Sequence, residues 1–432
     1  MTLYRILIVF FIFAFPLHAQ QQPLPKVFKF GDHKTNNSEI SISKSIVYTE
    51  ALGYGFDFNT GKHINFTKTG ISGIESTYFS VKLSEGDYKV DVILGGDTPS
   101  KTTIKAESKR LMLREIQVPK NKSVNNSFAI NVRTPKISDT TQINIKDREK
   151  NSLNWDDKLT LEFLGDFEIQ SITITPITKI TIVFLAGDST VTDQNLEPWA
   201  SWGQLITNYF TDDIVIANYA QSGASLPSFK ARHRLDKILS LMKKGDYLFI
   251  EFGHNDEKIK AEGNGAWGLY TNLLKEFVTK ARDKSGIPVL VTPTQRRAFD
   301  TNGKLKPTHG DFPNAMRKVA TDLQVPLIDI TKMTTKMYEA WGEASSRKAF
   351  VQYPANTFPG QTKALEDNTH FNSFGANEIA KAVLLGIQNL NLELSKYIIK
   401  ETPKYNPNQP DQLLDWTVPM SGRFENETPD GN

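Results

Sequence analysis

The sequence predicts a two-domain protein in which an all-β sandwich precedes an α/β domain with a parallel sheet. Residues 21–176 contain short runs that alternate apolar and polar side chains between turn residues, the pattern of half-buried antiparallel strands. From Ile180 onward, apolar runs alternate with segments of helical length, which is typical of βαβ units. The chain has 432 residues, enough for two separate cores.

Residues 1–19 have the composition of an export signal. Arg5 precedes an apolar run from Ile6 to Pro16, and Leu17-His18-Ala19 then stands before Gln20, which fits cleavage after Ala19. The alternative is a membrane anchor, but the run is short for a span. The chain has no cysteine, so disulfides and a lipid-modified cysteine are excluded. We expect a secreted or periplasmic protein with no membrane attachment after cleavage.

In the first domain, Tyr78–Leu83 and Tyr88–Leu94 alternate regularly and are joined by Ser84-Glu-Gly-Asp87, which predicts a hairpin. Regular strands separated by turns favour a sandwich. Further strands are predicted at 102–106, 111–118, 128–133, 159–163 and 171–175. Pro176 ends this domain.

The formal net charge of the chain is +3 and no basic run is interleaved with aromatic residues, so no nucleic-acid partner is expected.

The second domain, residues 179–395, has five apolar runs that predict buried parallel strands. They lie at 180–185, 214–217, 247–251, 289–292 and 327–330. Helices are predicted at 201–210, 227–243, 266–284, 314–323 and 375–389. Residues 396–432 are rich in Pro and Asn and are expected to form an irregular tail.

The strand Ile180–Leu185 is followed at once by Gly187-Asp188-Ser189. Open α/β sheets bind their ligands at the carboxyl ends of their strands, so Ser189 can be a nucleophile if a base lies near it. Serine is also a favoured helix cap, and from this stretch alone both interpretations stay open.

Three further patches supply the other groups that acyl transfer at serine requires. Asp367 and His370 are three residues apart, so one turn can bring the carboxylate beside the imidazole. Gly223, which follows the second strand, offers an unobstructed backbone N–H. Asn255, which follows the third strand, offers a neutral amide donor. Each has a structural alternative, a turn for Gly223 and a helix cap for Asn255. His254 is a competing base, for which we favour a structural role.

These patches resemble the four blocks of the SGNH (GDSL-type) hydrolases, which implies a flavodoxin-like three-layer α/β/α fold for the second domain. Five longer segments are similar to the rhamnogalacturonan acetylesterase family of carbohydrate esterases: Gly187–Val191, Trp202–Gln204, Phe252–Lys258, Thr292–Arg297 and Asp367–Phe371. The first domain is similar to the galactose-binding-like sandwiches that are often fused to such esterases.

The resemblance implies that Ser189 is the nucleophile, His370 the general base and Asp367 the acid that orients it. It also implies an oxyanion hole formed by the N–H groups of Ser189 and Gly223 and the Asn255 side chain. No cofactor and no metal are needed for this chemistry. The chain has no Gly-x-Ser-x-Gly stretch, which argues against an α/β-hydrolase nucleophile elbow.

The implied substrate is an acetylated polysaccharide, with the pectin component rhamnogalacturonan favoured. Acetylated xylan or another polysaccharide is the alternative within the same chemistry, and a non-catalytic carbohydrate-binding protein is an alternative of another class. A lipase would require an apolar lid segment, which we do not find. Four side chains are candidate substrate contacts: Arg296, Arg297, Trp199 and His309. The two arginines suit a galacturonate carboxylate but equally suit an internal salt bridge.

Overall fold

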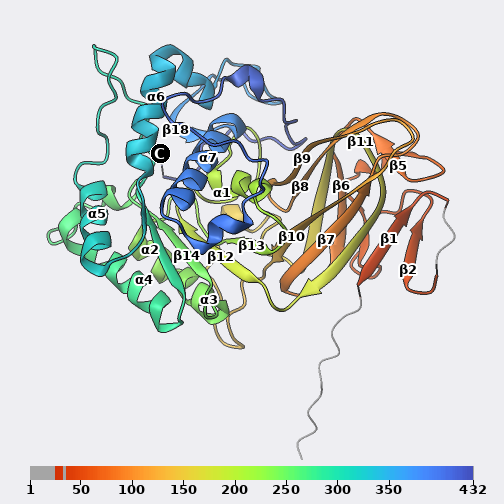
Figure 1. Cartoon of the computed structure of the whole chain (residues 1–432), viewed down its shortest axis with the longest axis horizontal. Coiled ribbons are helices and arrows are strands. Elements are labelled where there is room, and N and C mark those ends of the chain that lie inside the picture. Colours follow the sequence, from red (N-terminus) through yellow and green to blue (C-terminus); the bar gives the residue numbers. More distant parts are fainter. Residues whose placement is uncertain (1–24, 33–35, 432) are drawn as a thin grey trace, which may run out of the picture.

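The computed structural model describes residues 25–32 and 36–431, so the predicted signal peptide at residues 1–19 lies outside the described residues. Figure 1 shows an all-β half, formed by the strands in warm colours, beside an α/β half drawn in green and blue. Within the described part of the chain, no helix combines the length and the apolar character that a membrane crossing requires.

Two sheets make up most of the all-β half, and they share one long strand. The strands are β1 (Lys26–Phe30), β2 (Glu39–Ile42), β3 (Tyr54–Asp57), β4 (Asn65–Phe66), β5 (Ile71–Gly73), β6 (Thr77–Lys82), β7 (Gly86–Leu94), β8 (Ser100–Ala106), β9 (Arg110–Val118), β10 (Val124–Val132) and β11 (Lys158–Ile177). The first part of β11 pairs with β6 and β8, and the second part pairs with β1, β5 and β7. The strands of these sheets pair antiparallel except for the parallel pair β1 and β2. Phe28, Phe79 and Phe163 are fully buried in the core of this half. The region is all-β as predicted, and its similarity to galactose-binding sandwiches stays a prediction.

Two local predictions in this half are wrong. The runs 78–83 and 88–94 do not form a hairpin, because β6 pairs with β3 and β11 whereas β7 pairs with β10 and β11. The turn at 83–85 therefore passes from one sheet to the other. The strands predicted at 159–163 and 171–175 are one continuous strand, β11, which has a register shift between Ile169 and Ser171. Alternation marks a half-buried strand but does not say which sheet it joins.

The α/β half contains a five-stranded parallel sheet with the order β13-β12-β14-β15-β16. This is the flavodoxin-like order, in which the chain direction across the sheet reverses between the first and third strands. Its strands are β12 (Thr181–Gly187), β13 (Ile214–Asn218), β14 (Tyr247–Glu251), β15 (Ile287–Val291) and β16 (Leu327–Ile328), and a separate two-stranded sheet is formed by β17 (Phe350–Tyr353) and β18 (Leu365–Phe371). The predicted parallel sheet is confirmed.

Helices cover both faces of the sheet. They are α1 (Trp202–Leu205), α2 (Leu226–Ala231), α3 (Arg234–Leu241), α4 (Thr271–Asp283), α5 (Phe312–Leu323), α6 (Ile330–Ser346) and α7 (Ser373–Asn389). Along β12, Val183 and Leu185 pack with α1, α6 and α7, whereas Ile182 and Phe184 pack with α2 to α5. This alternation produces the three layers, with a core on each side of the sheet.

The helices differ from prediction at two places. The helix predicted at 227–243 is split into α2 and α3, because His233 between them has a left-handed backbone with φ of 60°. The helix α6 was not predicted; its first turns are rich in threonine, which has a modest helix propensity, and Gly342 interrupts it with φ of 76°.

Buried ion pairs connect the two halves beside the first strand of the parallel sheet. Arg110 Nε lies 2.8 Å and Arg133 Nη2 3.1 Å from Asp193 Oδ2. Lys105 and Lys109 lie 3.3 and 3.2 Å from the carboxylate of Glu197. Burial alone would raise the pKa of Glu197, but the two lysines bring it down to about 2. We call these four cations and two carboxylates the interdomain clasp.

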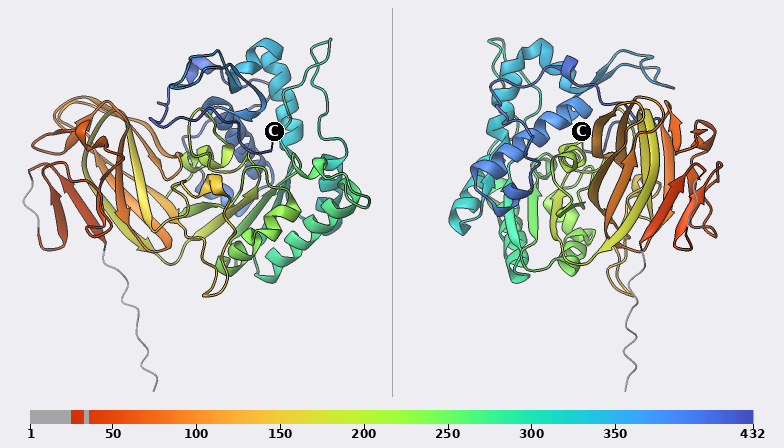
Figure 2. Two further views of the ribbon diagram at one scale, coloured as in Figure 1. Left: turned by 180° about the vertical axis from the view of Figure 1, so that it is seen from behind. Right: turned by 45° about the vertical axis from the view of Figure 1, so that its right-hand side comes forward.

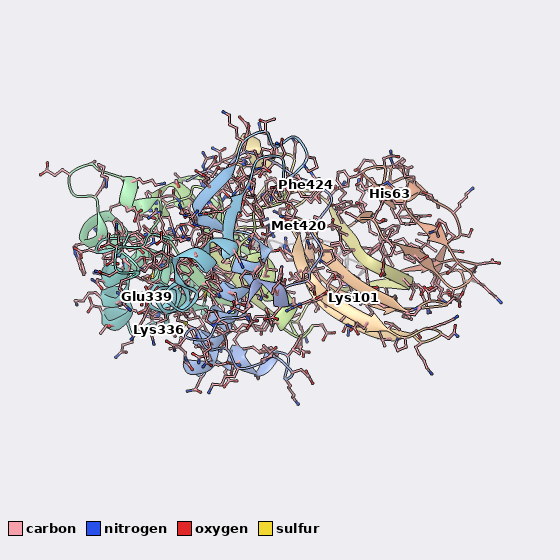
Figure 3. The ribbon with its side chains drawn as sticks, turned by 90° about the horizontal axis from the view of Figure 1, so that it is seen from above. His63, Lys101, Lys336, Glu339, Met420 and Phe424 are labelled. Atoms are coloured by element: carbon pink, nitrogen blue, oxygen red, sulfur yellow. The ribbon has the colours of Figure 1, made fainter. Side chains whose placement is uncertain are left out.

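The tail after residue 395 is irregular as predicted, apart from short helical turns, and it runs along the boundary between the halves. Figure 3 shows the labelled Met420 and Phe424 between Glu339 and Lys336 on one side and His63 and Lys101 on the other. Ser421 Oγ donates to Glu162 Oε2 of the all-β half at 2.6 Å, and its N–H donates to Glu197 Oε1 at 3.0 Å. The tail is thus bonded to both halves.

Candidate active site

The predicted site residues gather at the carboxyl end of the parallel sheet. Ser189 follows β12, Gly223 follows β13 and Asn255 follows β14. The strands β12 and β14 are the neighbours between which the chain order reverses, and this is where doubly wound sheets form a crevice for their ligands.

Ser189, His370 and Asp367 form a continuous chain of hydrogen bonds. His370 Nε2 lies 2.8 Å from Ser189 Oγ, and His370 Nδ1 lies 2.7 Å from Asp367 Oδ2. Since a carboxylate only accepts, Nδ1 carries the hydrogen and Nε2 is free to accept from the serine hydroxyl. Burial alone would raise the pKa of Asp367, but its bonds with the ring and N–H of His370 and with the N–H of Thr369 lower it.

Asp367 and His370 lie on a strand and not in the turn that their spacing suggested. They belong to β18, and the neighbouring Phe371 carbonyl accepts from the Ala200 N–H at 2.8 Å. The β17–β18 pairing and this bond hold the imidazole beside the loop that follows β12. The positions are therefore set by backbone hydrogen bonds rather than by a flexible connection.

Two of the three groups expected to bind an oxyanion, Gly223 and Asn255, both lie against Gly431 and are therefore close together. Gly223 has φ of 73°, a conformation that disfavours other residues. Within the described chain, the N–H groups of Ser189 and Gly223 donate to no other group, and Asn255 Nδ2 donates to the Ala224 carbonyl at 3.1 Å. The Asn255 amide has a second N–H, so each of the three expected groups keeps one N–H that no group of the described chain accepts.

A cluster of acidic and imidazole groups is buried beneath the nucleophile loop. Asp188 Oδ1 accepts from both the N–H and the hydroxyl of Thr190, and Asp188 Oδ2 lies 3.5 Å from His254 Nδ1. Burial, and then the charge of Asp188, raise the pKa of Glu251 to about 8. Burial lowers the pKa of His254 to about 4. His254 contacts Asp188 and not Ser189, in line with the structural role favoured for it.

The four candidate substrate contacts are mostly used within the protein. Arg296 Nη2 lies 2.6 Å from Glu257 Oε1, so it is ion-paired although its side chain stays partly exposed. The guanidinium of Arg297 donates to Ser346 and Asn368. His309 is 2% exposed and bonded to Glu257 and the Thr294 carbonyl.

Trp199 is fully buried, at 0% exposed. A ring with no accessible face cannot stack on a sugar, so the placements of Trp199, His309 and Arg297 are at odds with the predicted substrate contacts. The internal salt bridge weighed for Arg296 is present, and its contact with substrate stays a prediction.

The end of the tail lies at the site, which was not predicted. A Cβ added to Gly431 would lie 2.6 Å from Asn255 Oδ1 and 2.9 Å from Gly223 Cα, so Gly431 lies between these two residues. A Cβ added to Gly223 would meet Asp430 Cβ at 2.8 Å. Nothing in the residues Thr428 to Gly431 marks them as neighbours of a site more than 170 positions earlier in the chain.

Residues 185–376 match the GDSL-like lipase/acylhydrolase family model. The chain is 42% identical over 224 residues to rhamnogalacturonan acetylesterase RhgT of Bacillus subtilis, covering 51% of this chain and 96% of that protein. It is 34% identical over 222 residues to the probable rhamnogalacturonan acetylesterase YesY of the same organism, covering 51% and 98%.

A third relative matches most of the chain rather than half of it. The uncharacterized esterase YxiM of Bacillus subtilis is 24% identical over 387 residues, covering 85% of this chain and 91% of that protein. Taken with the hydrogen-bonded Ser189, His370 and Asp367 at the carboxyl end of a flavodoxin-like sheet, the family match and the identity to RhgT lead to one conclusion: the chain belongs to the GDSL-like lipase/acylhydrolase family of ester hydrolases.

Proposed function

We propose that this protein is a serine carbohydrate esterase that removes O-acetyl groups from pectin, with rhamnogalacturonan as its substrate. The observation that carries the proposal is the Ser189–His370–Asp367 chain, with Ser189 Oγ 2.8 Å from the free Nε2 of His370. The relatives RhgT and YesY, whose names specify rhamnogalacturonan acetylesterases, support the substrate class. A polymeric pectic substrate also agrees with the export signal predicted at residues 1–19.

The proposed reaction has two halves with one base. Ser189 Oγ attacks the acetyl carbonyl carbon while its proton passes to His370 Nε2, and the carbonyl oxygen becomes an oxyanion among the three donors. The bond to the sugar oxygen then breaks, and His370 gives that oxygen the proton. This leaves an acetyl group on Ser189 and a free sugar hydroxyl.

Water completes the cycle. His370 takes a proton from the water as its oxygen attacks the acetyl-serine, and the second tetrahedral intermediate collapses to acetic acid and Ser189. Asp367 stabilises the imidazolium formed in each half and keeps Nε2 directed at Ser189. These steps use side chains and backbone N–H groups of this chain together with one water molecule.

The test is acetate release from acetylated rhamnogalacturonan, acetylated homogalacturonan and acetylated xylan by the wild type and by Ser189→Ala. Release from rhamnogalacturonan that is lost in the variant is expected. Release from xylan in preference to both pectins would keep the mechanism and refute the pectin assignment. Equal release by Ser189→Ala would refute the nucleophile.

A further inference from the structure

A cavity of about 320 Å³ opens beside the candidate oxyanion hole, walled by three distant parts of the chain. They are the segment 146–155 between β10 and β11, the loops after β12 and β13, and the tail near Asp430. Figure 2 shows the short helix Asp147–Glu149 of the first segment, in gold in the left view, against the α/β half. Ser222, which precedes Gly223, lines the cavity, so the cavity adjoins the site of reaction.

Two cations on this segment face carboxylates of the tail. Lys146 Nζ lies 2.9 Å from Asp430 Oδ2 and donates to the Ser222 carbonyl at 2.6 Å. Arg148 Nη2 lies 3.1 Å from Glu425 Oε2, and its guanidinium donates to the carbonyls of residues 427 and 428 at 2.7 Å each. The tail therefore fills this part of the site with its own carboxylates.

A third cation in the cavity wall has unused donors. Arg133 is 3% exposed, and its Nη2 is bonded to Asp193. Its Nε and Nη1 have no hydrogen-bond partner within the part of the chain that the structure describes. Each of these N–H groups of a buried guanidinium suits an oxygen acceptor of its own, such as one oxygen of a carboxylate.

We propose that this cavity is a subsite for the carboxylate of an acidic sugar unit near the acetylated one in the same polysaccharide chain, with Lys146 as its main contact. Asp430 holds the position of that carboxylate in this structure, and substrate displaces the end of the tail. The displacement also uncovers Asn255, since Gly431 lies against its amide. The proposal rests on the proposed function, because it assigns that site an acidic rather than a neutral polysaccharide.

The three cations described above, Arg133, Lys146 and Arg148, come from the all-β half. RhgT and YesY align with about half of this chain over nearly their whole length. RhgT and YesY therefore have no counterpart of the all-β half. The subsite is a property of the two-domain chain, and it gives the all-β half a direct part in selecting the substrate.

The test is equilibrium binding of rhamnogalacturonan oligomers without acetyl groups, whose galacturonate units carry the carboxylates, to the full chain carrying Ser189→Ala, measured by calorimetry. Lys146→Ala is expected to weaken binding about tenfold, the cost of one charge-assisted hydrogen bond. Asp430→Ala is expected to tighten binding, because it removes the internal competitor. Lys150→Ala is the matched control: Lys150 lies four residues from Lys146, pairs with Asp147 and has a side chain that is 63% exposed.

Opposite signs for Lys146→Ala and Asp430→Ala identify the subsite even if one variant loses some stability. Equal binding by the Lys146→Ala and Lys150→Ala proteins, weaker binding by Asp430→Ala, or equal binding of neutral xylo-oligosaccharides by the parent would overturn the proposal. Hydrolysis of p-nitrophenyl acetate by the wild type is measured separately. Its absence would refute the esterase chemistry and would leave the binding result interpretable.

Discussion

Replacing Asp367 by asparagine removes one charge and exchanges one oxygen for an NH₂ group. Asp367 Oδ1 accepts from the N–H groups of Thr369 and His370, at 2.7 and 2.9 Å, whereas Oδ2 faces the His370 ring. Turning the NH₂ toward the two N–H groups would leave two buried donors without an acceptor, at about 1–3 kcal/mol each. The amide oxygen therefore stays on the backbone side, and the NH₂ group faces His370 Nδ1.

This orientation reverses the imidazole tautomer. A donor opposite Nδ1 favours the form that carries its hydrogen on Nε2, and Nε2 then cannot accept the proton of Ser189. We expect kcat to fall by about 10⁴-fold, or about 5.4 kcal/mol in the barrier, with KM nearly unchanged. Initial rates on p-nitrophenyl acetate and on acetylated rhamnogalacturonan measure both constants.

Glu366→Gln is the matched control, because Glu366 precedes Asp367 on β18 and has an exposed side chain. It loses the same charge without touching His370, so its rate is expected to match the wild type. A kcat for Asp367→Asn within tenfold of the wild type would refute the tautomer argument. So would an equal loss in the Glu366→Gln protein.

Three other predictions concern the oxyanion donor, the buried carboxyl and the clasp. Asn255→Ala is expected to lower kcat about a hundredfold or more at unchanged folding; a near-normal rate would count against an oxyanion role. Glu251 has a pKa raised to about 8 from about 4.5, so the folded state keeps a proton that the unfolded state releases, and stability falls as pH rises across that range. Glu251→Gln should flatten this dependence in urea unfolding at pH 5 and 8, by on the order of a few kcal/mol; an unchanged slope would exclude a protonated Glu251. Arg110→Ala leaves Asp193 buried with one cation fewer and should destabilise the protein by about 3–5 kcal/mol, whereas Lys136→Ala, at an exposed pair with Asp139, should change the unfolding free energy by less than about 1 kcal/mol.

The parallel sheet and the residues at its carboxyl end were predictable because the signals are local. An apolar run such as that of β12 marks a buried strand, and Gly-Asp-Ser directly after it marks the strand's end. Asp367 and His370 were found by their spacing, although their strand was not. Their catalytic roles remain predictions, supported by the distances between them.

The rest depends on contacts between distant positions. The strands β6 and β7 do not pair with each other because each pairs with β11, some 80 residues later. The alternation within β6 and β7 does not predict β11 as their partner. The burial of Trp199 and the hydrogen bonds of Arg297 to Ser346 and Asn368 also depend on contacts between residues far apart in the sequence. Nothing in the sequence around Lys146 or Asp430 predicts that they interact. The fold brings them into contact although they are 284 positions apart.

The interdomain clasp has a consequence for how such proteins diversify. Asp193 and Glu197 belong to the loop that contains Ser189, but their counter-charges are supplied by the all-β half. A recombination event that exchanged the all-β half for another sandwich would leave two buried carboxylates without cations, a few residues from Ser189. In relatives that have both halves, we therefore expect the two to be inherited together. Among two-domain relatives, we expect a loss of acidity at positions 193 and 197 to be matched by a loss of basicity at 105, 109, 110 and 133.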